Sequence, residues 1–131
     1  MTIRVVLVDD QPLQRAGFRL VLQSQPDMEV VGEAGDGAGA LVVVRNVPTD
    51  VVVMDVRMPR VNGIVATERI LADERVRSLG PPPRIVLLTA LELDDHVAAA
   101  ADAGAWTILY KDVAPDLLLE AIRGAADHVG D

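Results

Sequence analysis

The chain has 131 residues, half of them hydrophobic, with one Trp, one Tyr, one Phe and no Cys. A chain of this length is expected to form one domain around its own core, here an aliphatic one. Its 12 basic and 20 acidic residues give a net charge of −8, which disfavours direct nucleic-acid binding because phosphate contacts need cationic patches. The lack of Cys excludes disulfides and thiolate metal sites. No signal segment opens the chain and no apolar run approaches membrane-spanning length, so we expect a soluble, cytoplasmic domain without membrane contact.

Apolar runs and turn residues predict strands that alternate with helices along the whole chain. Short apolar runs that stop at turn residues predict strands at 4–8, 28–33, 51–55, 84–88 and 107–110. Apolar residues at three- and four-residue spacing predict helices at 12–25, 38–46, 64–79, 93–103 and 115–128. Gly63 permits a tight backbone after the central strand, and Gly104 is a predicted helix C-cap. This alternation indicates an α/β fold, a doubly wound five-stranded parallel sheet with the flavodoxin-like strand order 2-1-3-4-5.

The central run Val51–Asp55 organises the predicted site. Its apolar residues continue unbroken to Asp55, as in a strand buried on both faces of a parallel sheet. Ligands of open α/β sheets bind outside the carboxyl ends of the strands. The residues at the ends of the predicted strands are Asp9, Asp10, Asp55, Thr89 and Lys111. A parallel sheet places all of them on one edge, and the predicted order puts the first and third strands side by side.

These residue types suit metal binding and phosphoryl chemistry. Each close pair of carboxylates costs roughly 4 kcal/mol at about 4 Å and an effective dielectric of about 20, and a divalent cation offsets this repulsion. Oxygen ligands favour Mg²⁺ over zinc. A carboxylate can also act as a nucleophile and form an aspartyl-phosphate, for which Asp55 is the candidate. Lys111 and Thr89 would supply the ammonium and the hydroxyl that stabilise phosphoryl charge.

Two simpler interpretations apply to parts of this set. Asp9 and Asp10 could be an acidic pair at a helix N-terminus, which would leave Asp55 and Lys111 unexplained. Lys111 is the only lysine, beside eleven arginines. Codon usage could account for that count, or position 111 could require a compact ammonium.

Four short motifs then occur in a specific order: Val8-Asp-Asp10, Met54-Asp55 with Met58-Pro59 and Gly63, Leu88-Thr89-Ala90, and Lys111-Asp112. With these motifs the chain resembles, over essentially its whole length, a bacterial two-component response-regulator receiver domain. Three segments are similar to the NarL/FixJ subfamily, whose output is of the LuxR type: Gln14-Arg-Ala-Gly17, Val30-Val-Gly-Glu-Ala34 and Lys111-Asp112.

The resemblance implies a role for each of these positions. Asp55 would be the phosphoacceptor, with Lys111 as the phosphate counter-ion and Thr89 as the switch hydroxyl. The Mg²⁺ ligands would be Asp9, Asp10, Asp55 and the backbone carbonyl of Arg57. The phosphoryl donor would be a sensor histidine kinase. The domain would be a regulatory phosphoacceptor that can catalyse its own phosphotransfer and dephosphorylation, rather than an enzyme acting on a separate substrate.

The resemblance also implies a place in a longer protein. Residues 1–131 would form the receiver, followed by a helix-turn-helix output domain that is absent from this chain. The whole would regulate transcription, dimerise on phosphorylation, and contact DNA only through the output domain. A stand-alone receiver that acts by protein–protein binding is the alternative, and these residues do not decide between the two.

Two positions depart from the usual receiver pattern. Ile108 stands where receivers carry Tyr or Phe, and its restricted χ1 and shorter reach predict weak coupling to Thr89. We therefore expect Thr89 and residues 90–96 to carry the output while Ile108 keeps its rotamer. The leucines of Leu117-Leu-Leu119 span about 200° of a helix, wider than a core stripe needs. They predict either generic packing or an interface with another subunit.

Other families fit less well. A haloacid-dehalogenase-like phosphatase would need an acid two residues after Asp55, where Arg57 stands. An FMN-binding flavodoxin would need a hydroxyl- and glycine-rich loop after the first strand, where the sequence is Asp-Asp-Gln-Pro. A degenerate receiver would have lost Asp55, Thr89 or Lys111, and this chain retains all three.

Overall fold

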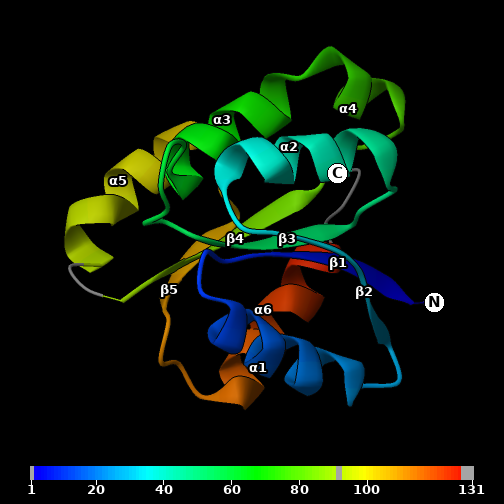
Figure 1. The fold of residues 1–131 in the computed structure, drawn as a ribbon, viewed down its shortest axis with the longest axis vertical. Coiled ribbons are helices and arrows are strands. Elements are labelled where there is room, and N and C mark those ends of the chain that lie inside the picture. Colours follow the sequence, from blue (N-terminus) through cyan, green and yellow to red (C-terminus); the bar gives the residue numbers. More distant parts are fainter. Residues whose placement is uncertain (1, 91–92, 128–131) are drawn as a thin grey trace.

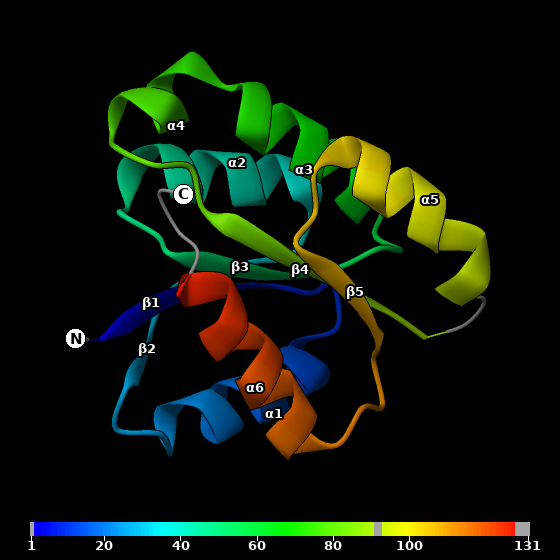
Figure 2. The same cartoon turned by 180° about the vertical axis from the view of Figure 1, so that it is seen from behind.

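The computed structural model describes residues 2–90 and 93–127, which form a parallel sheet between two layers of helices (Figures 1 and 2). The elements in chain order are β1 Ile3–Val8, α1 Pro12–Gln23, β2 Met28–Ala34, α2 Gly37–Asn46, β3 Val51–Asp55, α3 Gly63–Ala72, α4 Glu74–Ser78, β4 Arg84–Thr89, α5 Leu93–Ala103, β5 Thr107–Tyr110 and α6 Pro115–Ala126. The strand order is β2-β1-β3-β4-β5, and every neighbouring pair is parallel. The predicted fold class and strand order are confirmed.

Each face of the sheet has its own aliphatic core. Successive residues of a strand point to opposite faces, so Val5 and Leu7 of β1 belong to one core and Val6 and Val8 to the other. Helices α1 and α6 cover the first face, while α2, α3 and α5 cover the second (Figures 1 and 2). None of the helices in the described ranges combines the length and hydrophobicity that crossing a membrane requires.

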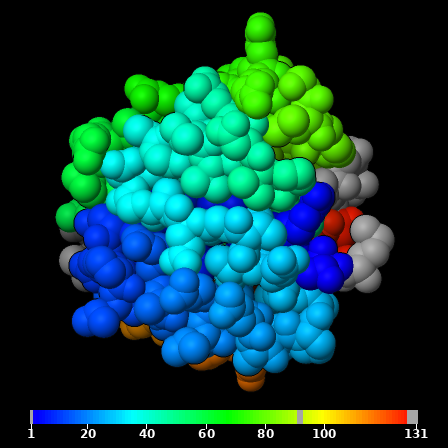
Figure 3. Space-filling model, turned by 45° about the vertical axis from the view of Figure 1, so that its right-hand side comes forward, coloured from blue at the N-terminus to red at the C-terminus, as the bar shows by residue number. Residues whose placement is uncertain are grey.

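The sheet is most deeply buried at its centre. Every residue of β3 is buried, because β1 and β4 flank it and helices cover both faces. β2 lies at an edge, as predicted, and is mostly half-buried. Figure 3 brings this edge forward and shows the chain from α1 through β2 to α2, coloured blue to cyan, at the surface. A side chain at the end of β3 therefore starts from a strand that is buried along its whole length.

The prediction of a single helix over 64–79 is wrong. The helix breaks at Asp73, whose ψ of 124° is extended, and two helices result. Asp73 Oδ1 accepts a hydrogen bond from the Val76 N–H at 3.0 Å, and Asp73 Oδ2 accepts one from Arg45 Nη2 at 2.6 Å. Aspartate competes with helix continuation by capping in this way, and the apolar spacing on both sides conceals the break.

Helix ends otherwise lie close to their predicted positions. α1 ends at Gln23, before the predicted Gln25. Gly104 follows α5 with a φ of +98°, which confirms it as the predicted C-cap. α6 continues to Ala126, and the predicted last residue, His128, lies outside the described residues.

The three consecutive leucines of α6 divide between core and surface. Leu118 and Leu119 are 2% and 6% exposed, and Leu117 is 53% exposed. Two of the three therefore pack in the core. Only Leu117 is available for contact with another molecule.

Gly63 allows the loop after β3 to fold back on the strand end. A Cβ at this position would overlap the carbonyl oxygen of Asp55, and the Gly63 N–H donates to the Val56 carbonyl at 2.8 Å. Any side chain here would displace the backbone that carries Asp55. The predicted tight backbone at Gly63 is confirmed.

We therefore expect Gly63→Ala to lower the free energy of unfolding by about 2 kcal/mol, the usual cost of overpacking. The matched control is Gly124→Ala in α6, where a Cβ would meet open space. That change should raise the free energy of unfolding by about 0.5–1 kcal/mol, as in other helix interiors. Urea denaturation followed by circular dichroism measures both. A Gly63→Ala variant as stable as the wild type would contradict the close approach.

Candidate functional site

The strand register brings the predicted residues together at one edge of the sheet. Val8 pairs with Met54, so Asp9 and Asp55 follow on adjacent strands. Asp55 pairs with Leu88, which places Thr89 one residue beyond. Three carboxylates, those of Asp9, Asp10 and Asp55, have oxygen atoms within 4.8 Å of one another. The predicted acidic cluster is thus present in the structure.

Lys111 joins two of these carboxylates. Its Nζ donates to Asp55 Oδ2 at 2.6 Å and forms an ion pair with Asp9 Oδ2 at 3.0 Å. Its backbone N–H donates to the Thr89 carbonyl at 2.8 Å, which fixes the residue just beyond β5. Burial alone would lower the pKa of Lys111, but the bonds to Asp55 and Asp9 raise it above its usual value. The side chain is therefore a fixed positive charge, only 13% exposed.

Two further hydrogen bonds hold Asp9 in place. Its Oδ1 accepts a hydrogen bond from the Gln11 N–H at 2.8 Å. Its backbone carbonyl accepts one from Arg15 Nη1 at 2.6 Å, and Arg15 is itself held by Glu33 at 3.0 Å. Sequence reasoning assigned no role to Arg15. The only available signal was its place one turn into the helix after Asp9, which did not predict a bond back to the strand end.

Burial opposes the ionised form of Asp55. The residue is 5% exposed. This desolvation, with the nearby charge of Asp9, outweighs the hydrogen bond from Lys111 and raises the pKa of Asp55 to about 6. At neutral pH the carboxylate is thus charged in surroundings that disfavour the charge, and a further cation would stabilise it.

The donor set fits a hard divalent cation. Asp9 and Asp55 are buried and Asp10 is exposed, and the buried Asp9 Oδ2 forms its ion pair with Lys111 but accepts no hydrogen bond. Such an atom can accept a metal bond, and an all-oxygen set favours Mg²⁺. Arg57, two residues after β3, lines a pocket of about 410 Å³ together with Asp10. That pocket opens the Asp10 side of the acidic cluster to solvent.

The two positions expected to transmit a signal lie on neighbouring strands. Thr89 ends β4 and is 2% exposed. Ile108 pairs with Leu87 and packs half-buried against the core under α3 and α5. Whether Ile108 keeps its rotamer on activation stays a prediction. Residues 91 and 92, part of the segment expected to move with Thr89, lie outside the described residues.

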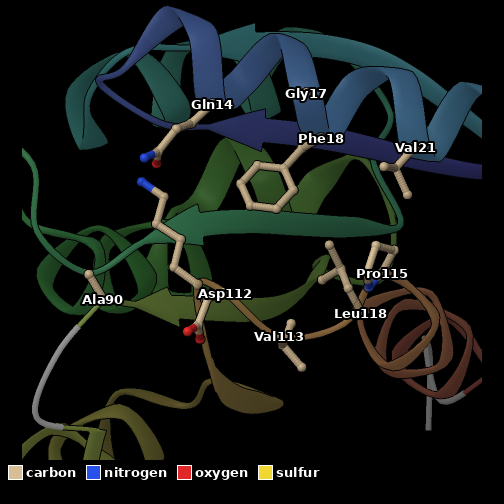
Figure 4. Close-up of a pocket in the computed structure, with 10 residues that line it drawn as sticks. Gln14, Gly17, Phe18, Val21, Ala90, Asp112, Val113, Pro115 and Leu118 are labelled. Carbon is tan, nitrogen blue, oxygen red and sulfur yellow. The ribbon is translucent and has the colours of Figure 1, made fainter.

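A larger cavity, of about 530 Å³, lies between α1 and α6 (Figure 4). Phe18 projects from α1 into this groove, opposite Pro115 and Leu118 at the start of α6 (Figure 4). Its walls are mainly apolar, and Lys111 and Asp112 connect it to the strand ends. Its lining lacks the three carboxylates, so we place the chemistry at the acidic cluster.

The raised pKa of Asp55 predicts how stability depends on pH. A carboxyl group whose folded pKa is raised favours folding below its unfolded pKa and loses that contribution as pH rises through the folded value, here about 6. Asp55→Asn keeps the neutral state at every pH. Without divalent metal its melting temperature should exceed that of the wild type at pH 7.5, by a margin that narrows at pH 5. An equal margin at both pH values would contradict the raised pKa.

Comparison with known proteins agrees with this fold. Residues 5–123 match the family model of the response regulator receiver domain. The chain is 45% identical over 124 residues to the uncharacterized transcriptional regulatory protein YxjL of Bacillus subtilis, covering 95% of this chain and 54% of that protein. It is 39% identical over 123 residues to the nitrate/nitrite response regulator NarP of Escherichia coli, covering 94% of this chain and 54% of NarP. The chain thus spans about half the length of these curated relatives.

Solved structures show the same relationship. The signal receiver domain of the response regulator NarL from Mycobacterium tuberculosis superposes with a TM-score of 0.85 at 34% identity, over 97% of this chain and 98% of that one. A LuxR-family response regulator from Aurantimonas sp. superposes with a TM-score of 0.86 at 32% identity, over 97% of this chain and 86% of that one. The chain therefore belongs to the response regulator receiver domain family and is related within it to the NarL/LuxR-type regulators.

Proposed function

We propose that this receiver is a phosphorylation-activated switch whose phosphoacceptor is Asp55. The observation that carries the proposal is the buried carboxylate of Asp55, 2.6 Å from the Lys111 ammonium, within a cluster of three acids. Family membership supplies the donor class, a phosphohistidine on a sensor histidine kinase. The domain is a regulatory phosphoacceptor that promotes its own phosphotransfer and dephosphorylation.

Asp55 acts as the nucleophile in this proposal. One of its carboxylate oxygens attacks the phosphorus of the phosphohistidine. The P–N bond breaks, its electron pair passes to the imidazole nitrogen, which takes up a proton, and a P–O bond joins the phosphoryl group to Asp55. In dephosphorylation, water attacks the same phosphorus. The P–O bond to Asp55 breaks, which releases inorganic phosphate and regenerates the carboxylate.

The surrounding residues stabilise the transferred group. Mg²⁺, when bound, would neutralise charge on the phosphoryl oxygens, and the residues that would hold it are Asp9, Asp10, Asp55 and the backbone carbonyl of Arg57. The Lys111 ammonium is already in place between Asp55 and Asp9 and needs no reorganisation to contact the phosphoryl group. The Thr89 hydroxyl, one residue beyond the partner of Asp55, would then bind the phosphoryl group and shift the following loop and helix.

The output is proposed from the relatives. YxjL and a second relative, LiaR of Bacillus subtilis, are named as transcriptional regulatory proteins, and this chain covers 54% and 56% of their lengths. We propose that residues 1–131 are the receiver of a cytoplasmic transcription regulator with a helix-turn-helix DNA-binding output domain outside this chain. A stand-alone receiver acting through protein–protein contacts is the alternative, and the length of the native chain decides between them.

Self-association on phosphorylation is proposed to involve α6. Leu117 stands 53% exposed beside its buried neighbours Leu118 and Leu119. Leu13 and Leu20 of α1 are likewise 88% and 73% exposed. An exposed apolar surface of this kind is typical of a contact between subunits.

Incubation with acetyl phosphate and Mg²⁺ should add one phosphoryl group, detected by intact mass. Asp55→Asn should add none, because the nucleophile is lost. Lys111→Met keeps Asp55 but removes the ammonium, and should slow phosphorylation about 100-fold. Equal labelling of wild type and Asp55→Asn would reject Asp55 as the phosphoacceptor.

Leu117→Glu should weaken the phosphorylated dimer at least about tenfold, because a charge replaces an apolar contact. The matched control is Leu79→Glu, which changes a leucine of similar exposure, 50%, after α4. Sedimentation velocity on the beryllofluoride-activated proteins measures the monomer–dimer balance. If both variants associate as the wild type does, Leu117 has no part in the interface.

A further inference from the structure

The side chain of Arg15 ties the first turn of α1 to the ends of two strands. Its backbone N–H donates to the Gln11 carbonyl at 3.0 Å, which fixes the residue in that turn. Its Nη1 donates to the Asp9 carbonyl, just beyond β1, at 2.6 Å, and its Nε donates to Glu33 Oε1, in β2, at 3.0 Å. The side chain is 23% exposed. No role for Arg15 follows from the chemistry proposed above.

The carbonyl that Arg15 contacts belongs to the peptide group between Asp9 and Asp10. A peptide group is planar, so a hydrogen bond to its oxygen also fixes the direction in which the chain enters Asp10. Asp9 has other anchors, because its N–H donates to the Ala34 carbonyl at 3.1 Å and its Oδ1 accepts from the Gln11 N–H at 2.8 Å. Asp10 is exposed and lies in the bend between β1 and α1. The bond from Arg15 therefore holds the peptide group that links two carboxylates of the proposed metal site.

Glu33 holds the guanidinium in place for this contact. Its two carboxylate oxygens accept bonds from Arg15 Nε at 3.0 Å and from Arg19 Nη1 at 2.7 Å. A guanidinium is planar and its donors point in fixed directions, so two engaged donors hold it in one orientation. Glu33 also offsets the charge of Arg15, and any charge that remains would repel a divalent cation. Arg15 can therefore favour metal binding only through the geometry of the turn that it holds.

Geometry distinguishes Mg²⁺ from Ca²⁺. Mg²⁺ requires near-ideal octahedral coordination at short distances, whereas Ca²⁺ accepts longer and more variable arrangements of oxygen ligands. Groups that orient metal ligands without touching the metal contribute to its affinity. We propose that Arg15 is a positioning residue of the metal site, which holds the peptide group between Asp9 and Asp10 in place and thereby favours Mg²⁺ over Ca²⁺. This inference rests on the proposed Mg²⁺ site.

Three substitutions separate position from charge. Arg15→Met removes the donors and the charge but keeps a long, unbranched side chain. Arg15→Lys keeps a cationic donor without the planar fork. Arg19→Met is the matched control, because it removes the same charge and the 2.7 Å ion pair with Glu33, while the bond from Arg15 to Asp9 stays.

Isothermal titration calorimetry with MgCl₂ and CaCl₂ at pH 7.5 measures the preference on the unphosphorylated protein. Arg15→Met should raise the dissociation constant for Mg²⁺ about tenfold and that for Ca²⁺ at most about twofold. Arg15→Lys should recover part of the Mg²⁺ affinity, and Arg19→Met should keep the wild-type ratio of the two constants. Circular dichroism checks that each variant is folded. A wild-type Mg²⁺ affinity in Arg15→Met, or an equal change for both cations, as a lost charge alone would produce, would overturn the proposal.

Nitrogen-15 relaxation of the metal-free protein tests the contact without any cation. In Arg15→Met the order parameter of the Asp10 amide should fall from about 0.85, the value of rigid backbone, toward the flexible range below about 0.6. In Arg19→Met it should stay unchanged. An equal order parameter in Arg15→Met and the wild type would also overturn the proposal.

Asp10→Ala distinguishes failure of this inference from failure of the proposed metal site. If the wild type and Asp10→Ala bind Mg²⁺ alike, or neither binds it, the metal site fails and the inference fails with it. If Asp10→Ala loses Mg²⁺ binding while Arg15→Met keeps the wild-type affinity, the metal site stands and the role of Arg15 is rejected.

Discussion

The ion pairs of Lys111 with Asp55 and Asp9 are the interaction on which the site depends. One ammonium lies 2.6 Å from Asp55 and 3.0 Å from Asp9, and it offsets only part of the repulsion among three acids. The pKa of Asp55 remains raised, to about 6. A buried carboxylate that is still short of positive charge is suited to bind a cation and then a phosphoryl group. Lys111 therefore holds Asp9 and Asp55 together but does not neutralise the charge of all three carboxylates.

The sheet makes this arrangement possible. β3 is buried along its whole length, so the position of Asp55 is set by core packing and by the loop that Gly63 lets fold against it. β1 and β5 bring Asp9 and Lys111 from opposite ends of the chain to the same edge. The packing of two aliphatic cores, one on each face of the sheet, offsets the repulsion between the clustered carboxylates. The clustered charges thus lie at the edge of a sheet that has an aliphatic core on each face.

The sequence predicts those parts of the structure that follow from chain topology. Asp9, Asp55, Thr89 and Lys111 each follow an apolar run, and parallel strands bring such ends together without any knowledge of side-chain contacts. Features that depend on partners distant in sequence were missed. Asp73, where the helix breaks, is bound by Arg45, 28 residues away, and Arg15 meets Asp9 and Glu33 only in the folded chain. The pattern of Leu117 to Leu119 left packing and interface open, and the structure assigns two leucines to the core and one to the surface.

Carbon-13 NMR of the Asp55 carboxyl group, titrated with and without Mg²⁺, tests the central claim most directly. Comparison with Asp55→Asn identifies the signal. Without metal the account predicts a titration near pH 6, and with saturating Mg²⁺ a shift to lower pH, because the cation stabilises the ionised form. A metal-free titration at the ordinary value for aspartate, about 3.9, and no response to Mg²⁺ would contradict it.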